Sequence, residues 1–177
     1  IAGNAKGAKI DNFIIGLPET KIQLSPIKVS FDGFKAFKDI TNKVSFSTRI
    51  LPSSITLHDI SPFVPALTNF RDKLNLKMRI KGTINQLTVE DLKINADDNL
   101  LISGGATFQD ISHIRDAYLF GDIQQLRINR AGMDFLVRNL VKNFSGTPSI
   151  LKRLGNIAFK GEISGYFNDL VTYGTFN

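Results

Sequence analysis

Apolar side chains recur at every second position through most of this chain, for example from Leu74 to Ile80 and again from Leu100 to Phe108. A period of two is the pattern of a β-strand, whose alternate side chains point to opposite faces of a sheet. The positions between them carry mostly lysine, serine, threonine, asparagine and arginine. This mixture is typical of antiparallel strands with one buried and one solvated face. The pattern therefore predicts a mainly β fold with about ten such strands.

One segment in the first half of the chain breaks this period. From Ile60 to Phe70 the apolar residues fall at the spacing of a helix, and Ser61 followed by Pro62 is a typical helix start. The sequence therefore predicts a short helix here. Asp59 lies just before it, at a position where the amino-terminal dipole of a helix stabilises an acid.

A second segment has the helical period more clearly. Between Asn129 and Phe144 the apolar residues recur every three or four positions, while Asp134 and several basic residues recur on another face. This pattern predicts an amphipathic helix of about three or four turns. The Ser-Gly-Thr-Pro sequence at 145–148 is expected to end it, and 150–154 is expected to form one further turn.

The two helical segments belong to two copies of a longer unit. Each copy has a strand, an acid at the start of a short helix and a strand that ends in glycine, with approximate bounds of 50–110 and 120–177 and a partial copy at 1–49. Repetition at such spacing favours an extended, open β architecture. We expect residues 1–177 to form one continuous segment rather than separate domains.

The matching acids of the two copies are the first candidates for chemistry. Asp59 and Asp134 lie 75 residues apart and suggest a pair of catalytic carboxylates, but a helix start explains an acid at each place without catalysis. His58 and His113 belong to no metal-ligand spacing and no recognisable triad. The glycines lack phosphate-binding spacing and are interpreted as bulges or bends in strands. We therefore expect no enzyme activity, no cofactor and no metal site.

Composition narrows the class of protein further. The chain has 22 basic and 16 acidic residues, a formal net charge of +6. Because the lysines mostly alternate with apolar residues, we expect them on solvated strand faces rather than in a nucleic-acid site. The absence of cysteine excludes disulfides and cysteine-based metal sites. No apolar run approaches the roughly 20 residues of a membrane helix, and we expect the chain to be part of a longer protein.

The apolar strand faces remain as the candidate functional surface. In a closed barrel or sandwich they would form an ordinary packed core. In a sheet curled only part way, with Gly104, Ala106 and Gly161 between the larger residues, they would leave an apolar groove suited to acyl chains. The residues that we expect to line this groove are Val44, Phe46, Leu74, Leu76, Met78, Ile80, Leu100, Ile102, Phe108, Ile157, Phe159 and Ile163.

Several segments of this pattern are similar to one protein family. They are residues 55–67, 76–87 and 100–104 leading into 108–111, together with Gly16-Leu17-Pro18-Glu19, which resembles a turn that the family places after a strand. In these segments the chain resembles the TamB branch of the AsmA-like envelope proteins (translocation and assembly module), in the form found in Bacteroidetes. The resemblance covers most of the chain, and its motifs are patterns of apolar residues, glycine and aspartate.

The resemblance implies a curled antiparallel β-taco, an open β-groove repeat with two short helices and a hydrophobic inner face. It implies an interior segment of a periplasm-spanning, bridge-like protein that carries phospholipid between the inner and outer membranes of a Gram-negative bacterium. Such a protein is anchored in the inner membrane by an amino-terminal helix and contributes to outer membrane biogenesis. A BamA-like barrel in the outer membrane would meet other parts of the full chain, and no nucleic-acid partner is implied.

Two other functions stay open at this point. An open sheet edge that holds incoming strands would make the chain a scaffold for the assembly, translocation or secretion of outer-membrane proteins. A closed, dry core would instead indicate a structural β-domain of the cell surface.

Overall fold

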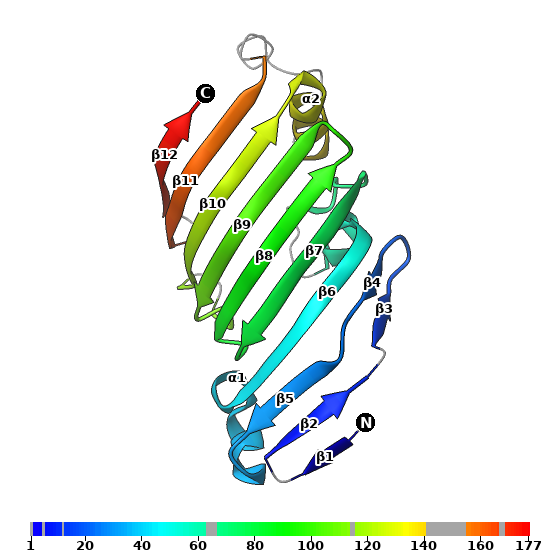
Figure 1. Ribbon diagram of the computed structural model, residues 1–177, viewed down its shortest axis with the longest axis vertical. Coiled ribbons are helices and arrows are strands. Elements are labelled where there is room, and N and C mark those ends of the chain that lie inside the picture. The colour runs from blue at the N-terminus through cyan, green and yellow to red at the C-terminus, as the bar shows by residue number, and fades with distance from the viewer. Residues whose placement is uncertain are drawn as a thin grey trace.

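The computed structural model describes residues 2–4, 6–11, 13–62, 67–113, 116–140, 155–166 and 169–177. Within these ranges the chain forms one open antiparallel sheet of 12 strands (Figure 1). The strand order is β1-β2-β5-β6-β7-β8-β9-β10-β11-β12, and the hairpin β3–β4 joins the sheet through β6. The mainly β, antiparallel fold that the alternation predicts is therefore confirmed.

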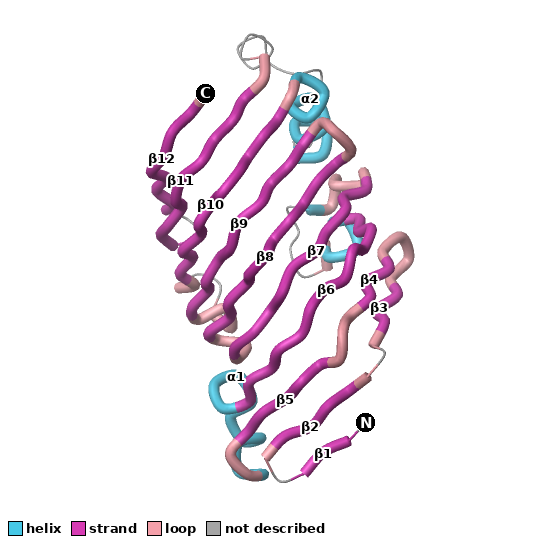
Figure 2. Tube along the Cα trace, viewed as in Figure 1, coloured by secondary structure: helices cyan, strands magenta, loops and turns pink. Residues whose placement is uncertain are grey.

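The strands lengthen from the amino-terminal end of the sheet toward its middle, and neighbours from β5 to β12 are also neighbours in sequence. Figure 2 shows that strands dominate the trace and that the helical pieces belong to the connections between consecutive strands. The strands are β1 (Ala2–Asn4), β2 (Gly7–Ile10), β3 (Ile14–Gly16), β4 (Lys21–Gln23), β5 (Ile27–Phe31), β6 (Val44–Thr56), β7 (Lys73–Gly82), β8 (Gln86–Ala96), β9 (Leu100–Gln109), β10 (Tyr118–Ile128), β11 (Ile157–Tyr166) and β12 (Asp169–Phe176). The helices are the 3₁₀ segments η1 (Phe34–Asp39) and η2 (Leu57–Ile60) and the α-helices α1 (Ile40–Lys43) and α2 (Arg130–Leu140).

Register shifts keep the apolar side chains of the long strands on one face. In β8 the apolar residues change from odd to even numbers between Val89 and Leu92, so an unbroken strand would turn them to opposite faces. The pairing with β7 and β9 shifts at this point, and Asp91, the residue within the shift, has a φ of 52°. This is the behaviour of a β-bulge, which adds one residue to one strand of a pair. Similar shifts occur in β6 and β10.

Two glycines at matching places in the repeat have the same backbone role. Gly82 ends β7 with a φ of 122°, and Gly165 lies near the end of β11 with a φ of 135°. A Cβ at Gly82 would lie 2.0 Å from the carbonyl oxygen of Gln86, and one at Gly165 would lie 2.2 Å from that of Asp169. Only glycine fits such a backbone without displacement, because its φ is positive and the next strand passes too close for a side chain.

The helix predicted from Ile60 falls largely on residues 63–66, which lie outside the described ranges, so it stays a prediction. Before these residues the 3₁₀ segment η2 ends at Ile60, and Ser61 and Pro62 form a turn. A backbone hydrogen bond of 2.8 Å from the His58 N–H to the carbonyl of Phe70 joins η2 to the segment that leads into β7.

The second predicted helix is present as α2 in the described part of the chain, while its expected end and the further turn lie within 141–154, outside the described ranges. One correction concerns its start. Asp134 lies in the second turn, and no acidic residue occupies the first turn. Asn129 caps the helix instead, since its side-chain oxygen accepts a hydrogen bond of 2.9 Å from the Gly132 N–H. Asparagine is well suited to this role, because it satisfies a free amide of the first turn.

The connection formed by η1 and α1 has no clear signal in the sequence. Its aromatic and aliphatic residues Phe34, Phe37 and Ile40 are all exposed, and only Ala36 among η1 residues is buried. Phe37 packs edge-on against Phe31 of β5, with ring centroids 4.8 Å apart. Because the connection buries no apolar stripe, no helical period marks it.

The main hydrophobic cluster lies between the sheet and α2, which Figure 1 places behind the upper ends of β9 and β10. Phe135 of α2 packs edge-on against Phe70, with ring centroids 5.4 Å apart and an interplanar angle of 76°. The buried members of this cluster are Ile50, Ile55, Phe70, Leu74, Leu76, Ala96, Leu100, Ile128, Met133 and Phe135. Helix α2 therefore covers part of one sheet face.

Candidate functional site

Cross-strand pairing places all the residues expected to line a groove on one face of the sheet. Ile80 lies opposite Val89, and Ile102 lies opposite both Ile94 and Leu126. Directly opposed residues share a face, so these pairs extend one surface from strand to strand. We call this surface the apolar face. Its larger strand residues are Ile27, Val29, Phe31, Val44, Phe46, Ile50, Ile55, Leu74, Leu76, Met78, Ile80, Leu87, Val89, Leu92, Ile94, Leu100, Ile102, Phe108, Leu119, Ile123, Leu126, Ile128, Ile157, Phe159 and Ile163.

The part of the apolar face beneath α2 is packed. Leu74 and Leu100 are 4% and 3% exposed, and both belong to the main cluster with Leu76. Met78, Ile80, Ile102 and Ile157 are partly buried and pack against the same cluster. These members of the expected groove lining are therefore in contact with protein atoms over much of their surface.

The part of the apolar face toward the other end of the strands lies outside this cluster. Phe46, Phe108 and Ile163 are half-buried, and none of them is a member of the cluster. Phe108 lies opposite Leu87 on one side and Leu119 on the other. Val44, also outside the cluster, lies opposite Phe31. Apolar side chains therefore continue across the sheet beyond the reach of α2.

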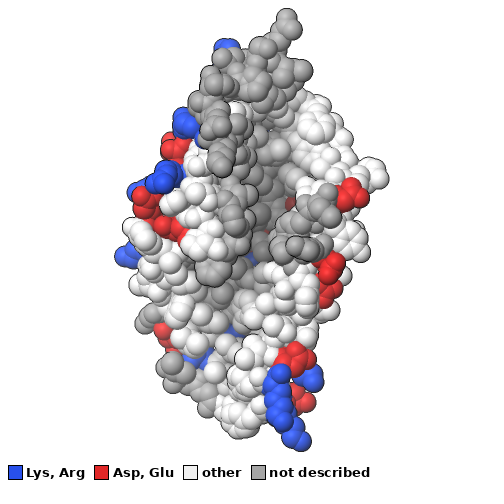
Figure 3. All heavy atoms as spheres, turned by 180° about the vertical axis from the view of Figure 1, so that it is seen from behind, with Lys and Arg blue, Asp and Glu red and all other residues white. Residues whose placement is uncertain are grey.

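Few charged side chains are visible in the middle of this face. Figure 3 shows the molecule from behind the view of Figure 1, and the blue and red spheres of its described residues gather mainly along the outer margins. Between the margins the surface is hollowed and the described atoms are largely uncharged. The opposite side of the same strands carries most of their charge: Lys77 lies opposite Lys93, and Arg79 opposite Glu90.

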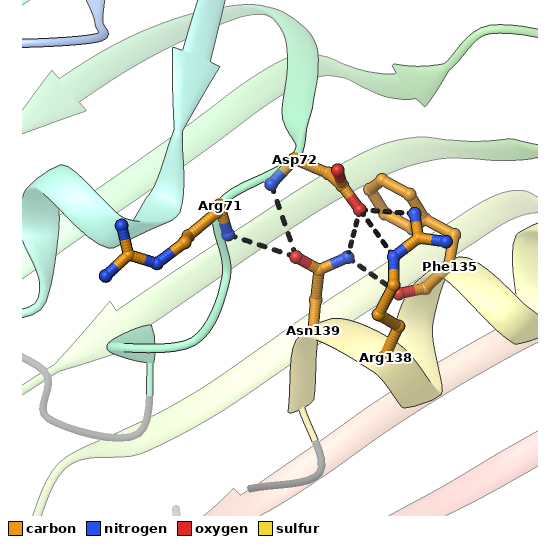
Figure 4. Close-up of polar contacts among 5 residues, drawn as sticks. All are labelled: Arg71, Asp72, Phe135, Arg138 and Asn139. Carbon is orange, nitrogen blue, oxygen red and sulfur yellow. Dashed lines mark hydrogen bonds and ion pairs between the residues drawn. The ribbon is translucent and has the colours of Figure 1, made fainter. Parts of the chain in front are cut away.

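A polar cluster fastens α2 to the segment that leads into β7 (Figure 4). The side-chain oxygen of Asn139 accepts hydrogen bonds from the backbone amides of Arg71 and Asp72, at 3.0 and 3.3 Å. Its Nδ2 donates to Oδ2 of Asp72 and to the carbonyl of Phe135, both at 2.7 Å. Asn139 is 2% exposed, and these four contacts use its full hydrogen-bonding capacity. A buried amide with no unmet bond holds the helix in one position.

An ion pair adds to this attachment. Nε of Arg138 donates to Oδ2 of Asp72 at 3.1 Å, and a second guanidinium nitrogen contacts the same oxygen. Partial burial alone would raise the pKa of Asp72, but the hydrogen bonds from Arg138 and Asn139 outweigh it and hold that pKa below its ordinary value of 3.8. The carboxylate is therefore charged at neutral pH, where it can accept all of these bonds.

A second ion-pair group lies on the opposite side of the sheet. Arg79 contacts Glu90 at 3.5 Å and Asp91 at 2.9 Å, and Lys81 also pairs with Glu90. The hydrogen bond from Lys81 is the main cause that lowers the pKa of Glu90. All four side chains are at least one-third exposed, so the group is a solvated surface feature that accompanies the bulge at Asp91.

Three of the residues considered for catalysis take part in local hydrogen bonds with the backbone. Asp59 accepts a hydrogen bond of 3.0 Å from the Glu19 N–H, and Nδ1 of His58 donates to the carbonyl of Thr68 at 2.6 Å. His113 lies in the turn after β9, where its N–H donates to the carbonyl of Asp110. Within the described ranges, histidines and acids form no group of three or more able to hold a metal ion.

The sequence did not indicate the attachment of α2. Asn139 could have indicated this attachment. It is a polar residue one turn beyond Phe135, on the buried side of an amphipathic helix. A buried amide side chain needs hydrogen-bond partners. Its partners Arg71 and Asp72 are 68 and 67 residues away, and no local pattern connects them.

Comparison of the chain with protein-family models, with curated proteins and with solved structures finds no match. Among the described helices, none has the length and apolar character needed to cross a membrane.

Proposed function

We propose that this chain binds the acyl chains of phospholipids on its apolar face and is a segment of a bridge-like lipid transport protein. In this proposal the open sheet curls into a groove whose floor is the apolar face. It has no enzymatic step: lipid moves along the surface, and the polar headgroup stays in water.

The observation that carries the proposal is the continuity of the apolar face. In β6, β8 and β10 the apolar positions change between odd and even residue numbers. A bulge at each of these places keeps the apolar side chains on the same face. A packed core beneath α2 would require apolar side chains only in that part of the sheet. The apolar face instead extends from β5 to β11, beyond the area that α2 covers. The side chains of this face are half-buried or buried in the single chain, and a concave apolar surface of this kind is typical of ligand-binding sites.

The energetics favour an acyl chain as the ligand. Moving one methylene from water to an apolar surface is favourable by about 0.8 kcal/mol, so a sixteen-carbon tail that left a bilayer for water would lose about 12 kcal/mol. A continuous apolar strip removes most of this cost. At about 4.8 Å per strand, the ten strands of the main path span about 45 Å, which is enough for two extended acyl chains placed end to end.

Helix α2 would set one limit of the proposed groove. The residues beneath it, such as Leu74 and Leu100, are buried against protein, so lipid would enter at the part lined by Phe46, Phe108 and Ile163. The helix would flank or close the groove at the end where Asn139 fastens it.

The cellular setting proposed here follows from the resemblance to the TamB branch of AsmA-like proteins. The full-length protein would be anchored in the inner membrane, cross the periplasm of a Gram-negative bacterium and serve outer membrane biogenesis. A BamA-like barrel would meet parts of the protein other than this segment.

Lipid uptake by the purified chain tests the proposal. The protein is incubated with vesicles of phosphatidylethanolamine and phosphatidylglycerol, reisolated, and examined for co-purifying lipid by native mass spectrometry. We expect bound phospholipid in the wild type, a loss of at least tenfold in Phe46→Asn, and no loss in Ser47→Asn, which changes the neighbouring residue on the opposite face. Absence of lipid from a folded wild type would contradict the proposal.

A second candidate function is a scaffold for outer-membrane protein assembly. The observation that favours it is the open antiparallel sheet of the described residues, because an incoming strand can add to the edge of an open sheet. This function predicts crosslinks from β12 to barrel proteins and no enrichment of lipid on the apolar face.

A further inference from the structure

The connection between β5 and β6 exposes three large apolar side chains. Phe34, Phe37 and Ile40 are 73%, 45% and 47% exposed. Residues three apart lie above one another on a 3₁₀-helix, and η1 is a 3₁₀ segment with Ile40 directly after it. The three side chains therefore form one ridge, which we call the exposed ridge. Its apolar side is turned to solvent, although an amphipathic helix normally turns that side to the protein.

Neither strand that the exposed ridge connects is an edge of the sheet. Strand β5 lies between β2 and β6, and β6 lies between β5 and β7. The exposure of the ridge therefore does not arise from an unpaired strand.

Hydrogen bonds hold the base of the exposed ridge in one position. The carbonyl of Thr41 accepts a bond of 3.0 Å from the N–H of Asn85, in the turn after β7, and Nδ2 of Asn85 donates to Oδ1 of Asn42 at 2.8 Å. Asn85 is 8% exposed, and its side-chain oxygen also accepts a bond of 3.3 Å from the Ser112 N–H. Two neighbouring connections thus fix α1, and the turn adds Ile84 as a further exposed apolar residue beside it.

Lysines accompany the exposed ridge. Together η1 and α1 contain three lysines and one acid, a formal charge of +2. Lys35, Lys38 and Lys43 are exposed, and none of them forms an ion pair with the described residues. The acid, Asp39, has a partner within the segment, since its Oδ1 accepts a hydrogen bond of 2.8 Å from Nδ2 of Asn42. The charge that this segment presents to solvent is therefore mainly positive.

The exposed ridge continues into the apolar face. The ring centroid of Phe31, the last residue of β5, lies 6.2 Å from that of Phe34 and 4.8 Å from that of Phe37. Phe31 lies opposite Val44 on the apolar face, and α1 leads directly into Val44. Figure 1 places α1 at the lower end of β6, away from α2 at the upper ends of β9 and β10. The ridge therefore adjoins the part of the apolar face where lipid is proposed to enter.

We propose that the exposed ridge inserts into the surface of an anionic phospholipid bilayer. Aromatic and aliphatic side chains with lysines beside them are typical of segments that lie in a membrane interface. The apolar side chains would enter the boundary between headgroups and acyl chains, while the lysine stems let their ammonium groups reach lipid phosphates. A protein that covered the ridge would instead desolvate the neighbouring lysines, and unpaired charges are costly to bury.

Insertion would dock the entrance of the apolar face on a membrane. An acyl chain could then pass from the bilayer to the apolar face without crossing water. This consequence rests on the proposed lipid function, but the insertion itself does not. It would place this segment of the proposed bridge next to a membrane surface.

Tryptophan fluorescence tests the insertion, because the chain has no tryptophan of its own. Phe34→Trp puts a reporter on the ridge, and Phe13→Trp puts one at an exposed phenylalanine before β3. The vesicles contain phosphatidylglycerol and dibrominated phosphatidylcholine, whose bromine atoms quench tryptophan in the acyl region. We expect a blue shift and at least twofold quenching at position 34, and neither at position 13. No response at position 34 in a folded protein, or equal responses at both positions, would overturn the proposal.

Vesicle flotation supplies the second readout. The wild type should float at least tenfold better with vesicles that contain phosphatidylglycerol than with phosphatidylcholine alone. Phe34→Asp should lose at least tenfold, and so should Lys35→Glu combined with Lys38→Glu. Lys73→Glu combined with Lys77→Glu changes the net charge equally on exposed positions of β7 and should float nearly as the wild type does. Flotation that does not depend on phosphatidylglycerol, or that is unchanged in Phe34→Asp, would overturn the proposal.

Other occupants of the exposed ridge give different results. A blue shift of Phe34→Trp that rises with protein concentration in the absence of vesicles would identify a second copy of the chain as the partner. Quenching that persists after the protein is reisolated from the vesicles would place a bound lipid on the ridge. Either result would overturn insertion into a bilayer.

The lipid-uptake assay separates this inference from the proposed function. If the reisolated wild type carries phospholipid but Phe34→Trp does not respond to vesicles, only the insertion of the ridge is wrong. If Phe34→Trp is quenched by vesicles and the reisolated wild type carries no lipid, the lipid function is wrong and the insertion stands.

Discussion

Asn139 of α2 donates a hydrogen bond of 2.7 Å to Oδ2 of Asp72, a residue 67 positions earlier in the chain. This bond joins the helix that covers the apolar face to the segment that begins β7. The same carboxylate oxygen also accepts a hydrogen bond from Arg138. The position of α2 over the sheet therefore depends on polar contacts as well as on the packing of Phe70 against Phe135.

Removal of the Asn139 side chain should loosen α2. In Asn139→Ala the amides of Arg71 and Asp72 lose their acceptor in a buried place, and we expect the free energy of unfolding to fall by about 1–3 kcal/mol. Arg138→Ala removes only a solvent-exposed ion pair and should cost less than about 1 kcal/mol. Urea denaturation of both variants measures the difference. Equal losses would show that the amide has no special role.

Asp72 should give the attachment a pH dependence. Its folded-state pKa is lower than its unfolded value of about 3.8, so its stabilising effect is present above pH 3.8 and is lost as pH falls through the lower folded value. The free energy of unfolding of Asp72→Asn should therefore be below that of the wild type at pH 7, and the difference should shrink as the pH falls below 3.8. Urea titrations between pH 7 and pH 2 measure this. A difference that is constant with pH would contradict the assignment.

Gly82 should tolerate no side chain. In Gly82→Ala a methyl group would meet the carbonyl of Gln86 at a positive φ, and we expect a loss of about 3 kcal/mol in the free energy of unfolding. Gly33 also has a positive φ but open space around it, so Gly33→Ala should cost only about 1 kcal/mol. Gly16 has neither a positive φ nor a neighbouring atom within 4 Å of an added Cβ. Thermal and urea denaturation that failed to reproduce this order would contradict the close approach of the strands at Gly82.

The fold should depend on the extra residue that the bulge at Asp91 adds to β8, and not on the side chain of Asp91. Deletion of Asp91 would turn Leu92 and Ile94 to the opposite face, and we expect the protein to lose about 4 kcal/mol or to fail to fold. Asp91→Gly keeps the residue count and suits the φ of 52°, so its stability should stay within about 0.5 kcal/mol of the wild type. Circular dichroism with urea denaturation distinguishes the two. A deletion variant of normal stability would show that the register is not fixed here.

The strands could be predicted from the sequence because the alternation of apolar residues is a property of each strand by itself. The bulges were harder to predict, although each left a trace: in β8 the apolar residues Val89 and Leu92 are three positions apart instead of two. A spacing of three within a strand is the signal, since it restores the face only if one residue is extra.

Long-range polar contacts and helix starts could not be predicted in the same way. The acid at position 134 suggested a helix start, but the cap is Asn129, because its amide reaches the free N–H of Gly132. The bond from the His58 N–H to the carbonyl of Phe70 joins residues 12 positions apart, and no local pattern indicates it. A count of apolar spacing contains no information about tertiary or capping hydrogen bonds of this kind.

The candidate lining residues lie on one face, as alternation implies, but the sequence could not show which of them α2 would cover. Leu74 and Leu100 are packed in the main cluster, whereas Phe46 and Phe108 lie outside it. The difference arises from α2, whose residues Met133 and Phe135 belong to that cluster. Photocrosslinking should therefore be placed at the part of the apolar face outside this cluster, at residues such as Phe108.

The most direct measurement compares two adjacent residues of β9. A photoreactive benzoylphenylalanine is placed at Phe108, on the apolar face, or at Gln109, on the opposite face, and the purified protein is irradiated with phospholipid vesicles. Mass spectrometry of the adducts should show phospholipid on the residue-108 variant at least tenfold above the residue-109 variant. Equal labelling at both positions, or no lipid adduct at position 108 in a folded protein, would contradict the central claim that the apolar face binds lipid.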